Sequence, residues 1–413
     1  MTYRVILLTL CVVVSAKSTL HAAIRSIPAG NSADGASRTA EYSAESAPTS
    51  SSESLEIALF DVSDYGGIGD AKTDSTEAFL SAWADACKYP GTSTLLIPNG
   101  TFHVGPISFE GPCYNNKAPQ VEIRGSLRAP SSLSAFPEPT WILFQDLRGL
   151  ALTGSGGAAV LDGQGEAAWA DPTCGERGKR TALPRSIRFQ NVSDGIISNI
   201  TLLNSKGFHV SLLHSYNVTV HGLNIIAPWD SPNTDGIHVG ESTNITISSS
   251  TIGVGDDCVS VGPGSFNISI FNITCGPGHG ISVGSLGRKE NENNVAGIAV
   301  RNCTINSTQN GVRVKTWPAS PRSSASDMIF QDIIMINVSN PIIIDQEYCP
   351  SENCAKSKAS YSSWTSTIFN EPSLHWRAFL HFAFAFGDDV EWCSARKSCW
   401  LRIRRIMLRL GVK

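Results

Sequence analysis

The sequence predicts an all-β fold in which one stacked parallel solenoid follows a short helix. From Ile187 onward, short runs of β-branched residues recur, each followed by Asn or Gly, at a variable period of roughly 18 to 27 residues, which is typical of stacked coils. Tight hairpin turns such as Asn-Gly, which a β-sandwich needs, are rare in these repeats. Gly, Asn, Ser, Val and Ile are abundant, whereas long helical patterns are few. A single elongated β domain follows from these observations.

Two segments precede the predicted domain. Residues 1–22 combine a basic residue, an apolar run too short to span a membrane and then small residues, which is the pattern of a secretory signal peptide. Residues 23–55 are rich in Ser and Ala and have no hydrophobic period, so we expect a disordered leader. Asp74 and Glu77 resemble a capping box, and the apolar residues that follow recur at helical spacing. A short amphipathic capping helix should therefore begin at about Ser75.

The solenoid is expected over residues 56–355, and residues 356–413 form a tail that breaks its pattern. The tail contains bulky aromatic residues and lacks both the Asn turns and the strand rhythm of the repeats. A shifted reading frame or a divergent end of the fold would each explain the break. Because an uncapped solenoid exposes an unpaired strand edge, the first explanation predicts an unstable or inactive protein.

The charge of the chain limits its partners. With a formal net charge of −4 and a pI near 6.1, the protein has no bulk attraction for nucleic acid or for an anionic membrane surface. A polyanionic ligand would have to meet a local basic patch. We expect a monomer.

The cysteines indicate an oxidising compartment. The chain has 11 of them, which suits a secreted protein. No CxxC pair or His cluster has the spacing of a metal site, so we expect no metal and no cofactor. Spacing alone suggests four disulfides, without fixing the connectivity: Cys87–Cys113, Cys258–Cys275, Cys349–Cys354 and Cys393–Cys399.

The repeats also contain Asn-x-Ser/Thr sequons, for which two interpretations remain open. The Asn side chains could carry glycans, or they could stack at the solenoid turns and hydrogen-bond with their counterparts in the next coil. The sequons include Asn191, Asn199, Asn217, Asn244, Asn267 and Asn272.

Acidic and basic residues recur one repeat apart along the solenoid. Asp256 follows Asp235 by about one coil, and His279 follows Asp256 by about one more. Arg313 and Lys315 come one longer coil beyond, two residues apart and so on the same side of a strand. Since neighbouring strands lie about 4.8 Å apart, these side chains should share one groove.

Two further candidate site residues lie close to this series in the sequence. Asn233 precedes Asp235 by two residues and should point the same way. Asp257 directly follows Asp256, so both enter the groove only if the backbone bends, and Gly253 and Gly255 allow that bend. Grouped carboxylates repel one another, which raises the pKa of at least one and suits an acid–base glycosidase. A calcium site built from the same carboxylates is an alternative.

Four segments of the sequence occur in an order that resembles a known family. "NTDGIHV", "GDDCVSVG", "CGPGHGISVGSLG" and "GVRVKTW" are similar to the signature segments of the polygalacturonases, and most similar to the plant members. The resemblance extends from about Phe60 to Cys354. It implies a single right-handed parallel β-helix and inverting hydrolysis of the α-1,4-galacturonosyl linkages of pectin, by a secreted enzyme that modifies the cell wall.

The resemblance also implies roles for residues at matching positions. Asp256 would be the general acid, and Asp235 and Asp257 would hold and activate the attacking water. His279 would tune the surroundings of the acid, and Asn233 would position Asp235.

Substrate binding is assigned in the same way. Arg313 and Lys315 would bind galacturonate carboxylates, because an acidic protein needs local cations to hold a polyanion. Tyr348 matches a substrate-contacting tyrosine. Two rival functions remain open: a pectate-type lyase, and a non-catalytic glycan-binding β-helix.

Overall fold

The computed structural model describes most of the expected solenoid. The expected signal peptide and leader, and most of the expected tail, lie outside the described residues, so those predictions stay predictions. No helix in the described part of the chain is long and apolar enough to cross a membrane. The described residues are 57–155, 157–170, 182–321, 323–350, 354, 364–365, 390–395 and 398–411.

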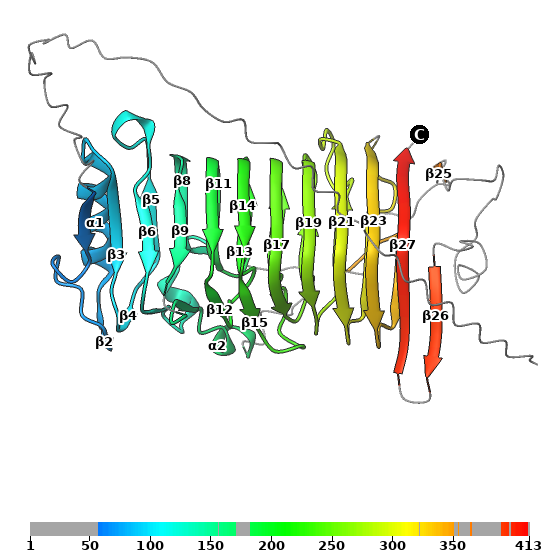
Figure 1. The fold of residues 1–413 in the computed structure, drawn as a ribbon, viewed down its shortest axis with the longest axis horizontal. Coiled ribbons are helices and arrows are strands. Elements are labelled where there is room, and N and C mark those ends of the chain that lie inside the picture. Colours follow the sequence, from blue (N-terminus) through cyan, green and yellow to red (C-terminus); the bar gives the residue numbers. More distant parts are fainter. Residues whose placement is uncertain are drawn as a thin grey trace, which may run out of the picture. The chain divides into compact units, whose positions relative to one another are not determined.

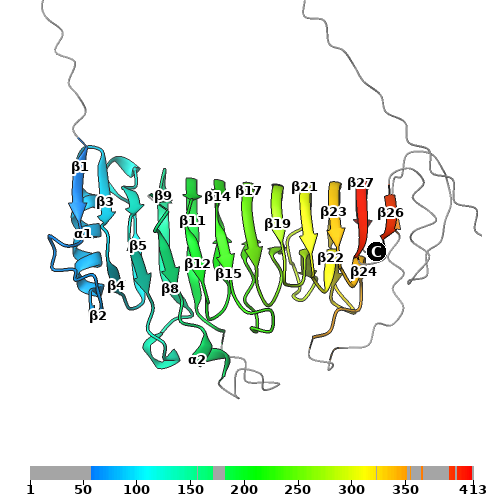
Figure 2. The ribbon, with the colours of Figure 1, turned by 60° about the horizontal axis from the view of Figure 1, so that its bottom comes forward.

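The strands form three ladders, to which successive coils contribute in turn. Figure 1 shows the strands side by side in chain order, and Figure 2 shows the same succession from another side. The ladder that carries the candidate site, here called the site ladder, contains β5 (Ile107–Glu110), the first halves of β8 (Thr140–Arg148) and β11 (Arg185–Ser198), β13 (Val210–Leu213), β16 (Ile237–Gly240), β18 (Val259–Val261), β20 (Ile281–Leu286), β22 (Asn310–Thr316) and β24 (Asn340–Asp345).

The other two ladders complete each coil. The long ladder contains β1 (Ala58–Asp61), β3 (Ser93–Ile97), β6 (Gln120–Ile123), β9 (Ala151–Gly154), the second half of β11, β14 (Tyr216–His221), β17 (Thr243–Gly253), β19 (Phe266–Cys275), β21 (Val295–Asn306) and β23 (Ser324–Ile336). The short ladder contains β2 (Asp70–Asp74), β4 (Thr101–His103), β7 (Ser126–Arg128), β10 (Val160–Asp162), β12 (Thr201–Leu203) and β15 (Asn224–Ile226), which pairs with the end of β17. These pairings are all parallel, so the predicted parallel solenoid is confirmed.

The core is built from rows of aliphatic side chains that repeat from coil to coil. In the site ladder, Ile237, Val259, Ile281 and Val312 are paired in register, and each is at most 2% exposed. Burial of such a side chain contributes about 1.5–3 kcal/mol. Each row therefore holds neighbouring coils in one register and fixes what the opposite side of each strand presents.

A helix closes the N-terminal end, as predicted. Helix α1 (Thr76–Lys88) packs Phe79 and Trp83 into the core. The predicted capping box does not form, because Ser75 makes no side-chain cap. Instead Asp74 Oδ1 accepts the Thr76 N–H at 3.0 Å, which satisfies one free donor of the first turn. The shorter helices are α2 (Glu166–Trp169) and the 3₁₀ turns η1 (Tyr114–Asn116) and η2 (Leu133–Ala135).

Three of the four suggested disulfides form. They join Cys87 to Cys113, Cys258 to Cys275 and Cys349 to Cys354. The side chains of Cys393 and Cys399 lie outside the described residues, so that pairing stays a prediction. Among the described residues Cys303 is a free thiol, and it is buried.

Polar side chains stack at the turns between coils. The six sequon asparagines named above all have a left-handed backbone, which Asn tolerates better than most residues. In four of them the amide nitrogen donates to a side chain of the preceding coil, which is the stacking interpretation. These bonds run from Asn191 to Asp146 (2.6 Å), Asn217 to Asp194 (2.7 Å), Asn267 to Asn244 (2.7 Å) and Asn272 to Ser249 (3.1 Å).

The described part of the tail pairs with the last coil. Strand β27 (Ser398–Gly411) runs antiparallel to β23, and β26 (Val390–Ala395) and β25 (Trp364–Thr365) both pair antiparallel with β27. This hairpin geometry explains why the tail lacks the rhythm of a coil. It pairs the edge of the long ladder that the sequence pattern left open.

Candidate active site

Three of the predicted site residues occupy equivalent places in successive coils. Asp235, Asp257 and His279 each lie two residues before their strands β16, β18 and β20 begin, and these strands pair in register. The spacing had suggested Asp256 at this level, which is wrong by one residue. A repeat of variable length gives the order of the coils but not the register within them.

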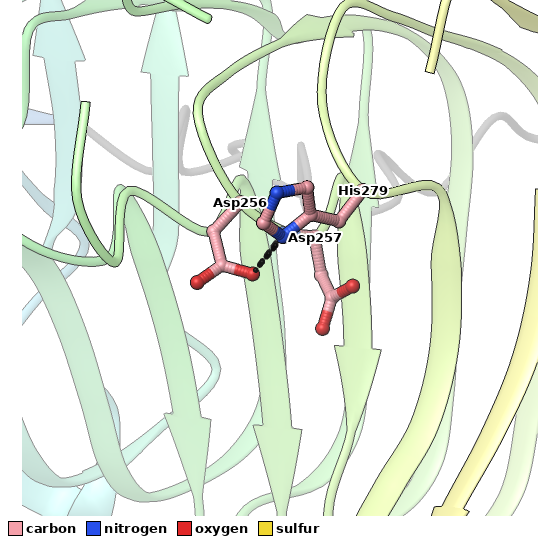
Figure 3. A group of neighbouring side chains, drawn as sticks. All are labelled: Asp256, Asp257 and His279. Atoms are coloured by element: carbon pink, nitrogen blue, oxygen red, sulfur yellow. Dashed lines mark hydrogen bonds and ion pairs between the residues drawn. The ribbon is translucent and has the colours of Figure 1, made fainter. Parts of the chain in front are cut away.

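The loop before β18 bends so that both adjacent aspartates belong to the same cluster. Gly255 lies against the preceding coil: a Cβ there would be 2.0 Å from the carbonyl oxygen of Ser231. Its N–H donates to Thr234 Oγ1 at 3.0 Å, and Asp256 Oδ1 accepts the N–H of Asp257 at 2.9 Å. Figure 3 shows the two carboxyl groups beside one imidazole ring. The bend needs Gly255 for space, since its backbone is not left-handed.

Asp257 is the most heavily bonded of the three carboxylates. Its Oδ1 accepts from Arg313 Nη2 at 2.8 Å and from Ser282 Oγ at 2.7 Å, and its Oδ2 accepts from Lys315 Nζ at 2.7 Å. Asp257 is 1% exposed and Lys315 is 6% exposed. Burial lowers the pKa of Lys315, but the charge of Asp257, its hydrogen bond and the charge of Tyr348 together outweigh this, so the net shift is upward. The bonds to Asp257 fix the orientation of its carboxyl group.

Asp256 faces His279. Its Oδ1 lies 2.9 Å from His279 Nδ1, and Asn233 Nδ2 donates to its Oδ2 at 3.4 Å. The predicted link between Asn233 and Asp235 is therefore replaced by a bond to Asp256. Burial raises the pKa of Asp256, but the hydrogen bond to His279 and the nearby positive charges outweigh it, so the net shift is downward.

The pKa of Asp235 is shifted in the direction opposite to that of Asp256. It is buried, and its pKa is raised well above the usual value by desolvation and by the negative charges of Asp256 and Asp257. Ser260 Oγ donates to its Oδ2 at 2.7 Å and partly offsets this. Lys315 also lowers it by its charge. In the free site the pKa values of Asp235 and Asp256 are therefore shifted in opposite directions.

Three residues beside these carboxylates were not predicted. His238, Ser260 and Ser282 are paired in register along the site ladder, in line with the predicted Arg313. His238 Nδ1 lies 2.8 Å from Ser260 Oγ. Because the Ser260 hydroxyl already donates its hydrogen to Asp235, the imidazole must be the donor in its bond to Ser260. Burial lowers the pKa of His238 to about 4, which keeps it neutral. The repeated letters "IHVG", "VSVG" and "ISVG" were the signal in the sequence.

Tyr348 closes the cationic end of the cluster. The ammonium of Lys315 lies 5.0 Å from the centre of the Tyr348 ring, and this ring meets Trp317 edge-on at 5.9 Å. A cation over an aromatic face is stabilised by the ring quadrupole. All eight predicted site residues therefore lie in one contiguous network.

Comparison with known proteins identifies the family. The model of "Glycosyl hydrolases family 28" matches residues 87–371, which is more than half of the chain. The chain belongs to glycosyl hydrolases family 28. It is therefore a glycoside hydrolase, and the matched residues include the whole carboxylate cluster.

Individual relatives support membership of family 28. An exopolygalacturonase of Platanus acerifolia is 44% identical over 312 residues, which cover 76% of this chain and 81% of the relative. A polygalacturonase of Gossypium barbadense is 45% identical over 312 residues, covering 75% of each protein. Among solved structures, the exopolygalacturonase of Thermotoga maritima superposes with a TM-score of 0.62 at 20% identity, covering 72% of this chain and 77% of that one. That last similarity supports the fold.

The alternative of a cation site in this family 28 enzyme does not fit the donor set. Ligand atoms of Asp256, Asp257 and His279 lie within 4.8 Å of one another. Both oxygens of Asp257, however, already accept from Arg313 and Lys315. A calcium ion favours several free carboxylate or carbonyl oxygens and would be repelled by these two cations.

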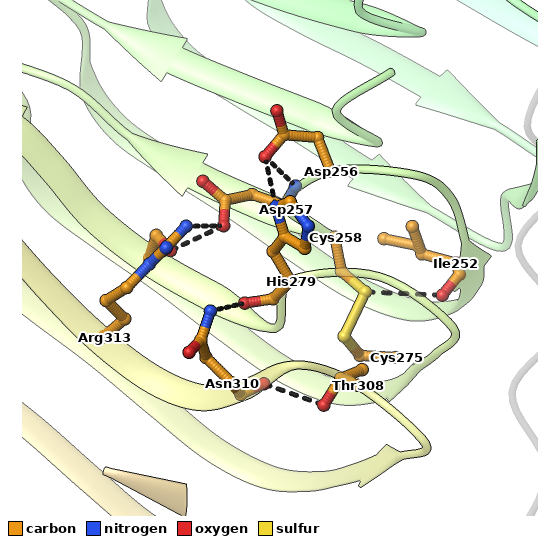
Figure 4. Close-up of a disulfide and its surroundings, with 10 residues drawn as sticks. Ile252, Asp256, Asp257, Cys258, Cys275, His279, Thr308, Asn310 and Arg313 are labelled. Atoms are coloured by element: carbon orange, nitrogen blue, oxygen red, sulfur yellow. Dashed lines mark hydrogen bonds and ion pairs between the residues drawn. A yellow bond between two sulfur atoms is a disulfide. The ribbon is translucent and has the colours of Figure 1, made fainter. Parts of the chain in front are cut away.

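A disulfide fixes the loop that carries the two adjacent aspartates. Cys258 directly follows Asp257 and is joined to Cys275 at the end of β19. Both half-cystines are fully buried, and Figure 4 shows them behind Asp257 and His279. The bond therefore ties the site loop to the long ladder, which limits the movement of both carboxylates.

Replacing Gly255 with Ala should damage catalysis more than stability. The new methyl group would meet the Ser231 carbonyl and move the loop, and a displacement of about 1 Å at a reacting group can cost about 100-fold. We expect kcat/KM to fall about 10- to 100-fold. Gly149→Ala is the control for backbone strain alone, because Gly149 has a left-handed backbone, meets nothing within 4 Å and lies outside the site ladder, so this variant should lose stability but keep its activity. Equal activity of the two variants would contradict this role of Gly255.

Proposed function

We propose that this chain is a secreted polygalacturonase that hydrolyses the α-1,4-galacturonosyl linkages of pectin with inversion. The observation that carries the proposal is the convergence of Asp235, Asp256 and Asp257 beside Arg313 and Lys315. A mildly acidic protein needs such local cations to hold a polyanionic polymer. The names of its relatives in family 28 support the same substrate.

The bond is broken by acid–base catalysis. Asp256 gives a proton to the glycosidic oxygen while the bond from that oxygen to the anomeric carbon breaks. Asp235 and Asp257 hold a water on the opposite face, and its oxygen bonds to the same carbon as its proton passes to Asp235. One water is consumed, and the new hydroxyl has the inverted configuration.

The free site lowers the pKa of Asp256, and the acid role needs substrate binding to reverse that shift. His279 Nδ1 lies 2.9 Å from Asp256 Oδ1, and this hydrogen bond is one cause of the lowering. A substrate carboxylate adds negative charge beside Asp256 and engages Arg313, one of the groups that lower its pKa. Substrate binding therefore favours the protonated carboxyl that catalysis needs.

Arg313 is the cation best placed for the substrate. Its Nε donates to Ser282 and its Nη2 to Asp257, which leaves Nη1 without a partner among the described residues. Lys315 is buried under Tyr348 and supports Asp257 from below. Tyr348 and the exposed Asn233 border the site and would contact the sugar ring.

The remaining properties follow from the sequence. The apolar segment in residues 1–22 supports secretion, and the polygalacturonases of plants among its relatives support action on pectin in the cell wall. We propose a leader at 23–55, a catalytic β-helix at 56–355 and a divergent tail at 356–413, acting as a glycosylated monomer without nucleic-acid or membrane partners. Of the six sequons named above, Asn199 and Asn244 have amide nitrogens that donate no described bond to a neighbouring coil, so these two are the best candidates for glycans among the six.

The test is hydrolysis of polygalacturonate. Purified protein should release reducing ends, and nuclear magnetic resonance of the first products should show the inverted anomer. A lyase would instead give an unsaturated, ultraviolet-absorbing product that is lost on chelation. Binding without any product would favour the non-catalytic alternative. Product lengths from a defined oligogalacturonide then distinguish internal from terminal attack.

Ser260→Ala should shift the acidic limb of the pH–rate profile. Asp235 must be ionised to accept the proton, and the Ser260 hydroxyl stabilises its ionised form. Without that bond the pKa of Asp235 rises further, so a higher pH is needed and the acidic limb of kcat/KM moves upward. The measurement is kcat/KM against pH, with Ser282→Ala, beneath Asp257, for comparison. An unshifted acidic limb would contradict the role of Asp235 as base.

A further inference from the structure

Two rows of site residues both reach an arginine on β11. The row of Asp235 and Asp257 continues to Arg185, because β11 pairs with β13 and β13 with β16 in register. The row of His238 and Arg313 continues through Ser211 to Arg188. Both arginines therefore lie on the groove side of the site ladder, two coils from Asp235 on the side away from Arg313.

Neither arginine is paired with a carboxylate, although the charge of Glu138 acts on Arg188 and that of Asp235 acts on Arg185. Within the described chain neither forms a salt bridge, and Arg188 Nε is buried without any hydrogen-bond partner. Arg185 donates one weak bond, from Nη1 to the Pro139 carbonyl at 3.4 Å. Burial lowers the pKa of both, and for Arg185 the charge of Arg188 adds to this. Two half-buried cations side by side are costly unless an anion joins them.

Arg185 is linked to the catalytic cluster through one aromatic ring. The Arg185 guanidinium lies 5.3 Å from the centre of the Phe208 ring, and that ring lies 5.0 Å from His238. His238 reaches Asp235 through Ser260. Arg185 also acts on Asp235 through its charge. A line of side chains thus continues from Asp235 over Phe208 to Arg185, and Arg188 acts on Arg185 through its charge.

We propose that Arg185 and Arg188 form a second carboxylate-binding subsite for the polymer, across the catalytic carboxylates from Arg313. The proposal rests on the proposed function, because the ligand is a galacturonate carboxylate. Arg188 lies two strands from β16, or about 10 Å, and Arg313 lies two strands from β18, so cations flank the cleavage point on both sides. A polymer with a carboxylate on every sugar can engage both ends, and a planar guanidinium suits that anion.

Arg188→Gln is the principal test. It should weaken binding of a defined oligogalacturonide, measured by calorimetry, by about 10- to 100-fold, because a hydrogen-bonded charge pair is lost. KM should rise by a similar factor while kcat is retained, since Arg188 does not touch the reacting atoms. Arg188→Lys keeps the positive charge but not the planar guanidinium, which can donate two parallel hydrogen bonds to a carboxylate, so it should recover part of the affinity.

Controls separate this subsite from a structural role and from the proposed function. Arg301→Gln changes an exposed arginine on β21 of the long ladder and should leave affinity unchanged. Equal affinity of Arg188→Gln and the unmodified protein would overturn the subsite while hydrolysis by the unmodified protein still supported the proposed function. If the unmodified protein neither binds nor cleaves, the proposed function itself fails. If Arg188→Gln has a much lower melting temperature than the unmodified protein, the binding test is repeated with Arg185→Gln. Unchanged affinity of that variant would again overturn the subsite.

Discussion

Asp256→Asn should lower kcat about 10²- to 10⁴-fold, which is the usual contribution of a positioned acid. The amide keeps the shape of the carboxyl but cannot deliver a proton to the glycosidic oxygen. His279 and Asn233 retain a polar partner at this position, so KM should change little. The measurement is steady-state hydrolysis of polygalacturonate at the pH of maximal activity.

A neighbouring aspartate supplies the matched control. Asp230 is exposed in the loop before β16 and carries no predicted role, so Asp230→Asn should retain full activity. A loss of activity in both variants would indicate a general effect of charge on the groove. Full activity of Asp256→Asn would contradict its assignment as the acid.

Lys315→Met should lower the free energy of unfolding by about 3 kcal/mol, since removing one partner of a buried ion pair leaves the other uncompensated. Asp257 is 1% exposed and would keep only Arg313 as a cationic partner. The side chain of Met has a length close to that of Lys, so the cavity is small and the loss is electrostatic. Thermal denaturation of the purified variant measures the change, seen as a lower melting midpoint.

Two comparisons test the electrostatic cause. Arg148→Gln removes an exposed partner of Asp194 and should leave the melting midpoint nearly unchanged. The double variant Asp257→Asn with Lys315→Met removes both charges and should melt above Lys315→Met alone. If the double variant melts lower than both singles, packing rather than charge explains the loss.

The sequence predicted the coils and the members of the site better than their contacts. Rows such as Ile237, Val259 and Ile281 arise from β-branched residues that recur in every repeat, so periodicity reveals them. The level of Asp256 was wrong by one residue, because repeat length cannot resolve such a shift when coils differ in length. The partner of Asn233 was wrong because Asn233 lies in a loop with a left-handed backbone, where the alternation of a strand does not apply.

The supporting residues were missed for a different reason. Ser260 and Ser282 look like ordinary polar strand residues until the coils are stacked, and only then does each lie beneath a carboxylate. Arg185 and Arg188 are distant from every signature segment in the chain. Their relation to Asp235 exists only through the pairing of β11, β13 and β16.

The side-chain bonds at the turns have a consequence for how this protein tolerates insertions and deletions. Asn217 is bonded to the coil before it, and Asn267 repeats the arrangement further on. Loss or duplication of one complete coil would present each amide with a similar acceptor, so the fold could change length in whole units. Deletion of a single residue would misalign the turn on both sides. Variation in natural or engineered versions should therefore come in multiples of a coil, or in loops outside the ladders.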